Sequence, residues 1–153
     1  PSANAKTATA GGSANRLGIG MEKAFYDKAD RLLAAITADP RWDMQDELLF
    51  QVMGFTFYGY CFGFGRLVCL MDADAIDAYV TDKLVALGAG ATYVQGMVAR
   101  ARQDFVTTAD VASVDPDDVL SQLIGVGHAH FAADDVAALV ESIFNNYDLL
   151  RNA

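Results

Sequence analysis

Apolar side chains recur every three or four positions through most of the chain that follows residue 20. Between Met21 and Ala38 they form one stripe, and Pro40 ends the pattern. Similar stripes predict four more helices, at about 72–87, 91–106, 115–127 and 132–150. No segment alternates apolar and polar residues as a half-buried strand would. The pattern therefore predicts an all-α protein, a single bundle of five to six helices.

One further helix, beginning near Asp43 and continuing to Met71, has a different pattern. From residue 48 onward its only clearly polar side chains are Gln51, Thr56 and Arg66, so it is apolar on every side. Such a helix is either the centre of a bundle or a membrane span, and this one is long enough to span. The polar residues inside it and the lack of a positively charged flank favour a core helix. A membrane association through residues 48–71 is the alternative.

Glycines interrupt this apolar helix at an unusual frequency. Four of the twelve residues 54–65 are glycine, although each costs up to about 1 kcal/mol against alanine in a helix interior. Gly59 and Gly63 are four residues apart, a spacing that lets another backbone approach closely. We expect a tight crossing here by the first, fourth or sixth helix of the bundle.

The same segment also carries many aromatic residues, which raises a second interpretation. The glycines would make room for an apolar ligand or pigment, and the aromatic rings would line its pocket. The candidate residues for this ligand-binding or helix-packing surface are Phe55, Tyr58, Gly59, Phe62 and Gly63.

Both histidines of the chain lie close together, at His128 and His130. In an extended segment their side chains would point the same way and could share a metal. Zinc needs two further ligands, and the sequence supplies no second pair at a standard spacing. We therefore expect His128 and His130 to lie in a loop that joins two helices. We assign no metal, no cofactor and no catalytic residue. An enzyme that uses His128 or His130 stays open as an alternative.

The two cysteines, Cys61 and Cys69, fall in the apolar helix. Eight residues place them about 12 Å apart along a helix axis, too far for a disulfide. Both are expected to be free and buried, and a thiol in apolar surroundings is a poor nucleophile. No serine or glycine motif of covalent catalysis or phosphate binding is present.

The balance of charge narrows the choice of partners. Eleven basic and 20 acidic residues give a net charge of −9, without a cluster of lysine and arginine. Nucleic acids require a basic face, so we expect no nucleic-acid partner. The acidity also disfavours an anionic membrane surface and is compatible with a basic partner protein. Hydrophobic residues make up 53% of the chain, enough for a sizeable core.

Residues 1–20 differ from the helical domain at 21–153, because they are mostly alanine, glycine, serine, threonine and asparagine. Ordering a backbone costs about 1–2 kcal/mol per residue, which a tail of this composition cannot offset alone. We therefore expect an extended N-terminal tail that docks on another subunit. The chain opens with Pro1 rather than methionine and has no apolar signal-peptide core, which points to processing or a partial chain and leaves its localisation open.

These observations favour a non-catalytic helical interaction protein, a subunit or adaptor of a hetero-oligomeric assembly. Binding of an apolar ligand or pigment is the first alternative. The histidine-dependent enzyme is the second.

Overall fold

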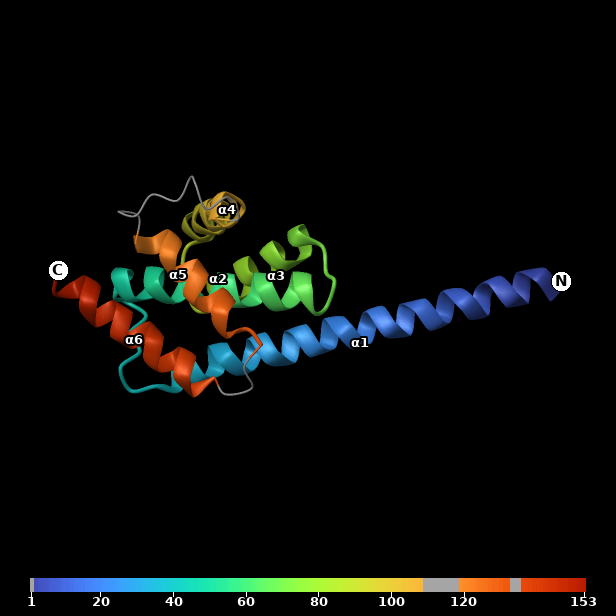
Figure 1. The fold of residues 1–153 in the computed structure, drawn as a ribbon, viewed down its shortest axis with the longest axis horizontal. Helices are drawn as coiled ribbons and strands as arrows, with labels where there is room; N and C mark the ends of the chain where they lie inside the picture. Colours follow the sequence, from blue (N-terminus) through green and yellow to red (C-terminus); the bar gives the residue numbers. More distant parts are fainter. Residues whose placement is uncertain (1, 109–118, 133–135) are drawn as a thin grey trace.

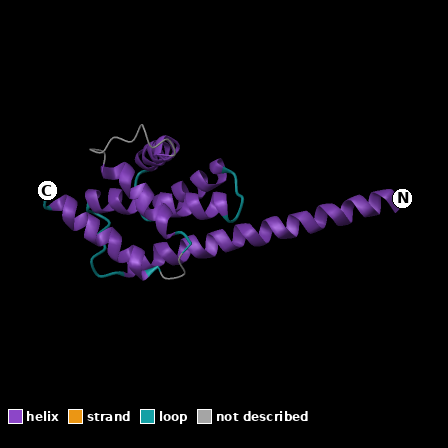
Figure 2. Ribbon diagram, in the orientation of Figure 1, coloured by secondary structure: helices purple, strands orange, loops and turns teal. Residues whose placement is uncertain are grey.

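The computed structural model describes residues 2–108, 119–132 and 136–153. These residues form six helices and no strand (Figures 1 and 2): α1 Ser2–Ala38, α2 Glu47–Leu67, α3 Ala73–Ala86, α4 Ala91–Thr108, α5 Val119–His130 and α6 Ala137–Arg151. The prediction of an all-α bundle is confirmed. The predicted starts of the last two helices, at about 115 and 132–133, fall at or within the gaps between the described residues.

Helix α2 is the central element of the bundle. It contacts each of the other five helices, and 15 of its 21 residues are buried. It is the one helix in the described part of the chain that is long and apolar enough to cross a membrane, but 83% of its most apolar window lies inside the bundle. Burial on every side explains why this helix lacks a polar face.

The start of α2 is Asp46 and not Asp43. The Asp46 carboxylate accepts a hydrogen bond from the backbone N–H of Leu49 at 3.2 Å, as an N-cap residue does. Its second oxygen accepts a hydrogen bond from the Tyr147 hydroxyl on α6. Asp43 instead accepts from the backbone N–H of Gln45 within the preceding turn. The tertiary contact with Tyr147 thus distinguishes two aspartates that are equivalent as sequence signals.

A glycine-mediated crossing of α2 and α5 lies at the middle of the bundle. A methyl group on Gly59 would collide with the backbone carbonyl of Ile124, and one on Gly127 would collide with the carbonyl of Thr56. The two backbones therefore touch with no side chain between them. The close approach expected at Gly59 is present, but the partner is α5 and not one of the three helices named from the sequence. Gly127, which permits the approach from the α5 side, is the reason.

Helix α1 begins at Ser2, well before Met21, so the residues assigned to an extended tail continue the helix. Its N-terminal part leads away from the other five helices (Figure 1). Alanine-rich composition favours this continuation, and no proline interrupts residues 2–38. Residues 20–24 are exposed, and the first buried side chain described on α1 is Phe25. Packing in the bundle thus starts close to the predicted boundary.

Replacing Gly59 with alanine should lower the free energy of unfolding by about 1–3 kcal/mol or more, because the added methyl group overpacks the contact with Ile124. Gly96 on α4 is the matched control, since a methyl group there meets nothing within 4 Å. Gly96→Ala should raise the free energy of unfolding by about 0.5–1 kcal/mol. Urea denaturation of both variants measures the difference. Equal stabilities would contradict the close crossing.

Candidate ligand-binding cavity

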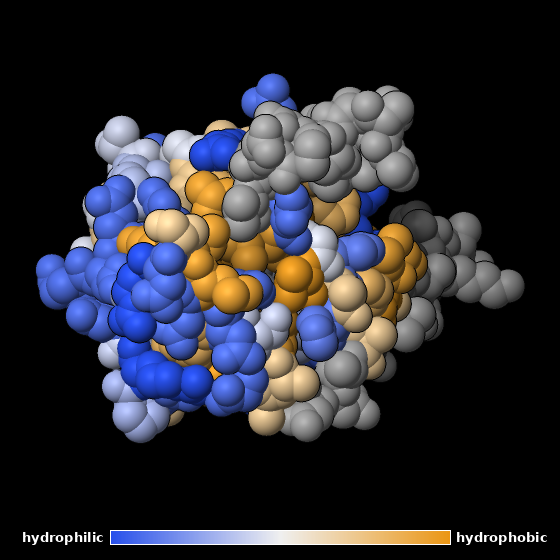
Figure 3. Space-filling model, turned by 60° about the vertical axis from the view of Figure 1, so that its left-hand side comes forward, coloured by the Kyte–Doolittle hydropathy of each residue, from blue (hydrophilic) through white to orange (hydrophobic). Residues whose placement is uncertain are grey.

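A cavity of about 530 Å³ lies between the C-terminal half of α2, the end of α4 and α5. Its lining is mostly apolar and consists of Phe62, Gly63, Arg66, Leu67, Phe105, Ile124, Gly125 and His128. The bundle also leaves apolar side chains on its outside, and Figure 3 shows them gathered in the middle of one face beside a hydrophilic flank. Leu67 belongs both to the lining of the cavity and to the exposed apolar residues of the described part of the chain.

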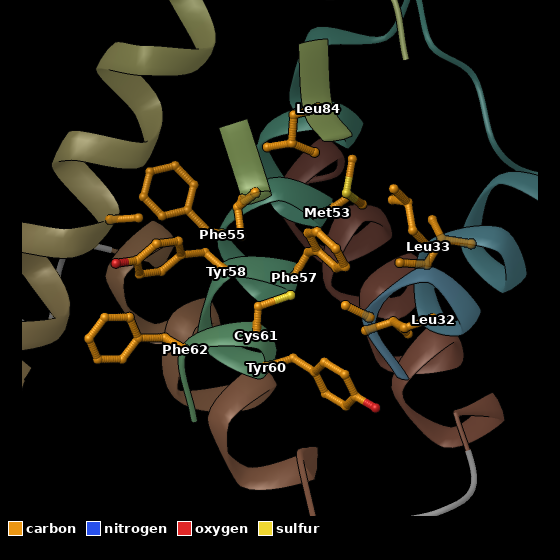
Figure 4. Packing of buried hydrophobic residues seen from close by; sticks show 14 of the residues in the cluster. Leu32, Leu33, Met53, Phe55, Phe57, Tyr58, Tyr60, Cys61, Phe62 and Leu84 are labelled. Atoms are coloured by element: carbon orange, nitrogen blue, oxygen red, sulfur yellow. The ribbon is translucent and has the colours of Figure 1, made fainter. Parts of the chain in front are cut away.

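Aromatic rings from α2 and α4 form the apolar wall. The ring centroids of Phe62 and Phe105 are 4.4 Å apart, and those of Tyr58 and Phe62 are 5.5 Å apart. Figure 4 shows Phe55, Tyr58 and Phe62 pointing from α2 to the same side, toward α4. Successive turns of α2 thus supply one ring each, in line with the helical repeat.

A polar cluster behind the wall holds Tyr58 in place. Its hydroxyl donates a hydrogen bond of 2.7 Å to the Asp77 carboxylate on α3, which also accepts one of 2.6 Å from Arg102 on α4. Burial, together with Asp77, raises the pKa of Tyr58. The phenol therefore stays protonated and ties three helices together.

The imidazole of His128 forms the opposite wall. It lies between the rings of Phe105 and Phe131, with centroid separations of 5.4 and 5.1 Å. The ring sits directly over Gly63, where an added methyl carbon would lie 2.6 Å from Nδ1. Gly63 thus serves to admit a histidine side chain and not a second backbone.

The Nδ1 atom of His128 is buried and has no hydrogen-bond partner in the described part of the chain. A buried N–H donor without an acceptor costs about 1–3 kcal/mol, and no described residue supplies an acceptor to this atom. The packing therefore favours a lone pair on Nδ1 and the proton on Nε2. The Nε2–H edge is then the polar group that His128 can offer to the cavity.

Arg66 is the one charged residue among the described residues that line the cavity, and no acidic side chain belongs to that lining. Its Nη1 donates a 2.8 Å hydrogen bond to the backbone carbonyl of Met71, which fixes the guanidinium at the end of α2. A guanidinium carries five N–H donors, so this bond leaves several for a ligand. The polar groups of the cavity are hence hydrogen-bond donors.

The five candidate residues named from the sequence have four different positions. Phe62 and Gly63 line the cavity, and Tyr58 lies behind Phe62. Gly59 belongs to the helix crossing, and Phe55 packs under the Arg100 guanidinium at 5.5 Å.

Phe105, Ile124 and Gly125 were missed because they lie on helices whose apolar stripes do not show which neighbour they contact. Phe105 on α4 and Ile124 on α5 follow ordinary helical patterns. Gly127, three residues after Ile124, is the one pointer that could have indicated a close approach by α5.

The histidines do not lie in a loop, as the sequence had indicated, but in the last turn of α5. Two residues along a helix correspond to a rotation of about 200°, so His128 and His130 point to different sides. They cannot share a metal in this arrangement. No group of three or more His, Cys, Asp or Glu side chains within residues 2–108, 119–132 and 136–153 could hold a metal ion.

The two cysteines are free and buried, as predicted. The apolar helix ends at Leu67 and not at Met71, so Cys69 lies in the turn after α2 and the spacing along one helix does not apply to it. Burial raises the pKa of the Cys61 thiol well above its ordinary value, which keeps it protonated and unreactive. Cys61 points away from the cavity side of α2, opposite to Phe55 (Figure 4). Thiol chemistry therefore plays no part in the cavity.

No protein-family model, curated protein or solved structure matches the chain. The function proposed below consequently rests on the chemistry of the cavity and on the shape of the bundle.

Replacing His128 with leucine should leave the free energy of unfolding unchanged or raise it by up to about 1 kcal/mol. The reason is that a buried nitrogen without a partner is exchanged for apolar atoms of similar volume. Thermal and urea denaturation test this, with His130→Leu as the control that removes no such nitrogen. A loss of more than about 2 kcal/mol in His128→Leu would show that the imidazole has a structural partner.

Proposed function

We propose that this protein binds a small amphipathic molecule in the cavity between α2, α4 and α5. The ligand has an apolar body and an anionic, hydrogen-bond-accepting head. The observation that carries this proposal is the arrangement of the lining, in which two donor side chains, Arg66 and His128, accompany otherwise apolar residues.

The size and composition of the cavity fit such a ligand. Pockets for small molecules usually measure about 300–1,000 Å³ and combine an apolar lining with a few polar groups that orient the ligand. The rings of Phe62 and Phe105 offer flat apolar surface to the body of the ligand. The buried Nδ1 atom of His128 has no hydrogen-bond partner in the described part of the chain, which lowers the stability of the fold. Such a cost is expected where a side chain is held in position for a ligand.

The charge of the lining selects an anionic head. Arg66 brings a positive charge to the cavity of a protein whose net charge is −9, and the described lining residues include no carboxylate. A carboxylate head can accept hydrogen bonds from a guanidinium in a bidentate geometry. An amine head would be repelled by the same group.

Binding fits the lining better than catalysis does. His128 is the one described lining residue of a type that commonly serves as a general acid or base. Acid–base or nucleophilic catalysis would need a second reactive group in contact with the same ligand. The enzyme that uses His128 therefore has less support than a binding protein.

The preference for the head group provides the test. Decanoate, decanol and decylamine have the same apolar chain, and calorimetric titration should give the tightest binding for decanoate and the weakest for decylamine. Arg66→Gln should weaken decanoate binding about tenfold and change decanol binding little, because one charge-assisted interaction is lost.

Arg31→Gln is the matched control for that experiment, since Arg31 is exposed on α1 and does not line the cavity. Its affinity for decanoate should equal that of the wild type. Equal affinities for the three compounds, or an equal loss in Arg31→Gln, would contradict an anion-selective cavity.

A second candidate function is supported by α1. We propose that this helix also joins the protein to another subunit, because its N-terminal part leads away from the bundle (Figure 1). Gly20 to Ala24 have exposed side chains or backbone although they belong to a continuous helix. A helix that leaves its own bundle can pack on a partner, and the charge of −9 is compatible with a basic one.

A chain beginning at Gly20 tests the role of this segment. Its melting temperature should equal that of the full chain within error, because the first described buried residue of α1 is Phe25. If α1 docks on a partner, proteins that copurify with the full chain should no longer copurify with the shortened chain. Native mass spectrometry of the two preparations measures this difference. A shortened chain that fails to fold would instead assign these residues to the protein's own core.

A further inference from the structure

The turn between α2 and α3 exposes three aliphatic side chains within four residues. Leu67, Val68 and Leu70 have exposed fractions of 62%, 47% and 72%. The residues between and after them, Cys69 and Met71, are buried. We refer to Leu67, Val68 and Leu70 together as the aliphatic turn.

The backbone of this turn makes leucine an unfavourable choice at position 70. Met71 N–H donates to the carbonyl of Gly65 at 2.9 Å, a hydrogen bond that closes the turn after α2. Leu70, just before Met71, has a left-handed backbone conformation with φ +55°. Glycine adopts this conformation most readily, because the Cβ atom of other residues is crowded there.

The packing of Leu70 does not compensate for this conformation. Its side chain is 72% exposed, so it contributes little to the core. A strained backbone and an exposed aliphatic side chain at the same residue indicate a role outside the stability of the fold.

The aliphatic turn is continuous with the mouth of the cavity. Leu67 and Arg66 line the cavity, and Arg66 also holds the turn through the Met71 carbonyl. Both lining residues are exposed, so a surface that contacts the turn lies beside an exposed edge of the cavity.

We propose that the aliphatic turn inserts into the interfacial region of an electrically neutral lipid bilayer and so places the mouth of the cavity at the membrane surface. Three aliphatic side chains form a patch much smaller than the roughly 800 Å² per partner that a stable protein interface buries. A bilayer requires apolar contact alone. The net charge of −9 opposes an anionic surface, which is why a neutral one is preferred.

This contact should be weak and reversible, because a few aliphatic side chains bury little apolar area. A reversible contact is what uptake of an amphipathic molecule from a bilayer requires. Membrane contact by the aliphatic turn depends on where the cavity lies and not on whether it holds a ligand. The membrane contact and the proposed ligand can therefore be tested separately.

Flotation of the full chain with phosphatidylcholine vesicles tests the inference. The variant Val68→Ser/Leu70→Asn removes two aliphatic side chains that do not line the cavity, and asparagine tolerates the left-handed conformation. It should bind vesicles about tenfold more weakly than the wild type, with no fall in melting temperature and unchanged affinity for decanoate. Leu149→Gln on α6 is the matched control, because Leu149 is 71% exposed but remote from the turn in sequence. It should bind like the wild type.

Three results would overturn the inference. The first is a wild-type chain that does not float with phosphatidylcholine vesicles. The second is tighter binding when part of the phosphatidylcholine is replaced by anionic phosphatidylglycerol. The third is a loss of self-association in the Val68→Ser/Leu70→Asn variant while vesicle binding persists, which would make the turn an interface between two copies of the chain.

Discussion

The contact of the α2 and α5 backbones at Gly59 and Gly127 determines the rest of the architecture. Two helices that touch without intervening side chains must diverge on either side of the crossing, since they are straight rods at an angle (Figure 1). On the C-terminal side of Gly59 the space between them is filled in part by His128, which lies over Gly63. The remaining space is the cavity. The same two glycines thus account for the core contact and for the opening beside it.

Two local costs occur at the same end of α2. The Nδ1 atom of His128 is buried without a partner, and Leu70 has a left-handed backbone conformation. Each lowers stability by an amount that a simple substitution could recover, and both residues adjoin the cavity or its mouth. Natural sequences violate local rules of this kind mainly where function requires it. Their proximity supports a functional role for this end of the molecule more strongly than either cost would alone.

The opposite side of α2 is packed as an ordinary apolar core. Phe57, Met53 and Cys61 face Leu32 and Leu33 of α1 in an apolar interior (Figure 4). The Asp46 cap and its bond to Tyr147 fix the start of the helix. A packed side of α2 opposite the cavity is a suitable scaffold for a binding site, because it holds the lining rings in position.

The sequence by itself determined the helical class, because this follows from periodicity and composition. It favoured a central position for the apolar helix and a close approach at Gly59, and left a membrane span and a ligand pocket open as alternatives. It also predicted that both cysteines are free. The tertiary structure alone decided which helix crosses α2, which aspartate caps it, and that Phe105, Ile124 and His128 share a cavity with Phe62. These depend on contacts between distant segments, where several helices with similar apolar stripes could have competed. Gly59 on α2 and Gly127 on α5 let these two helices approach each other closely, and the cavity lies beside their crossing.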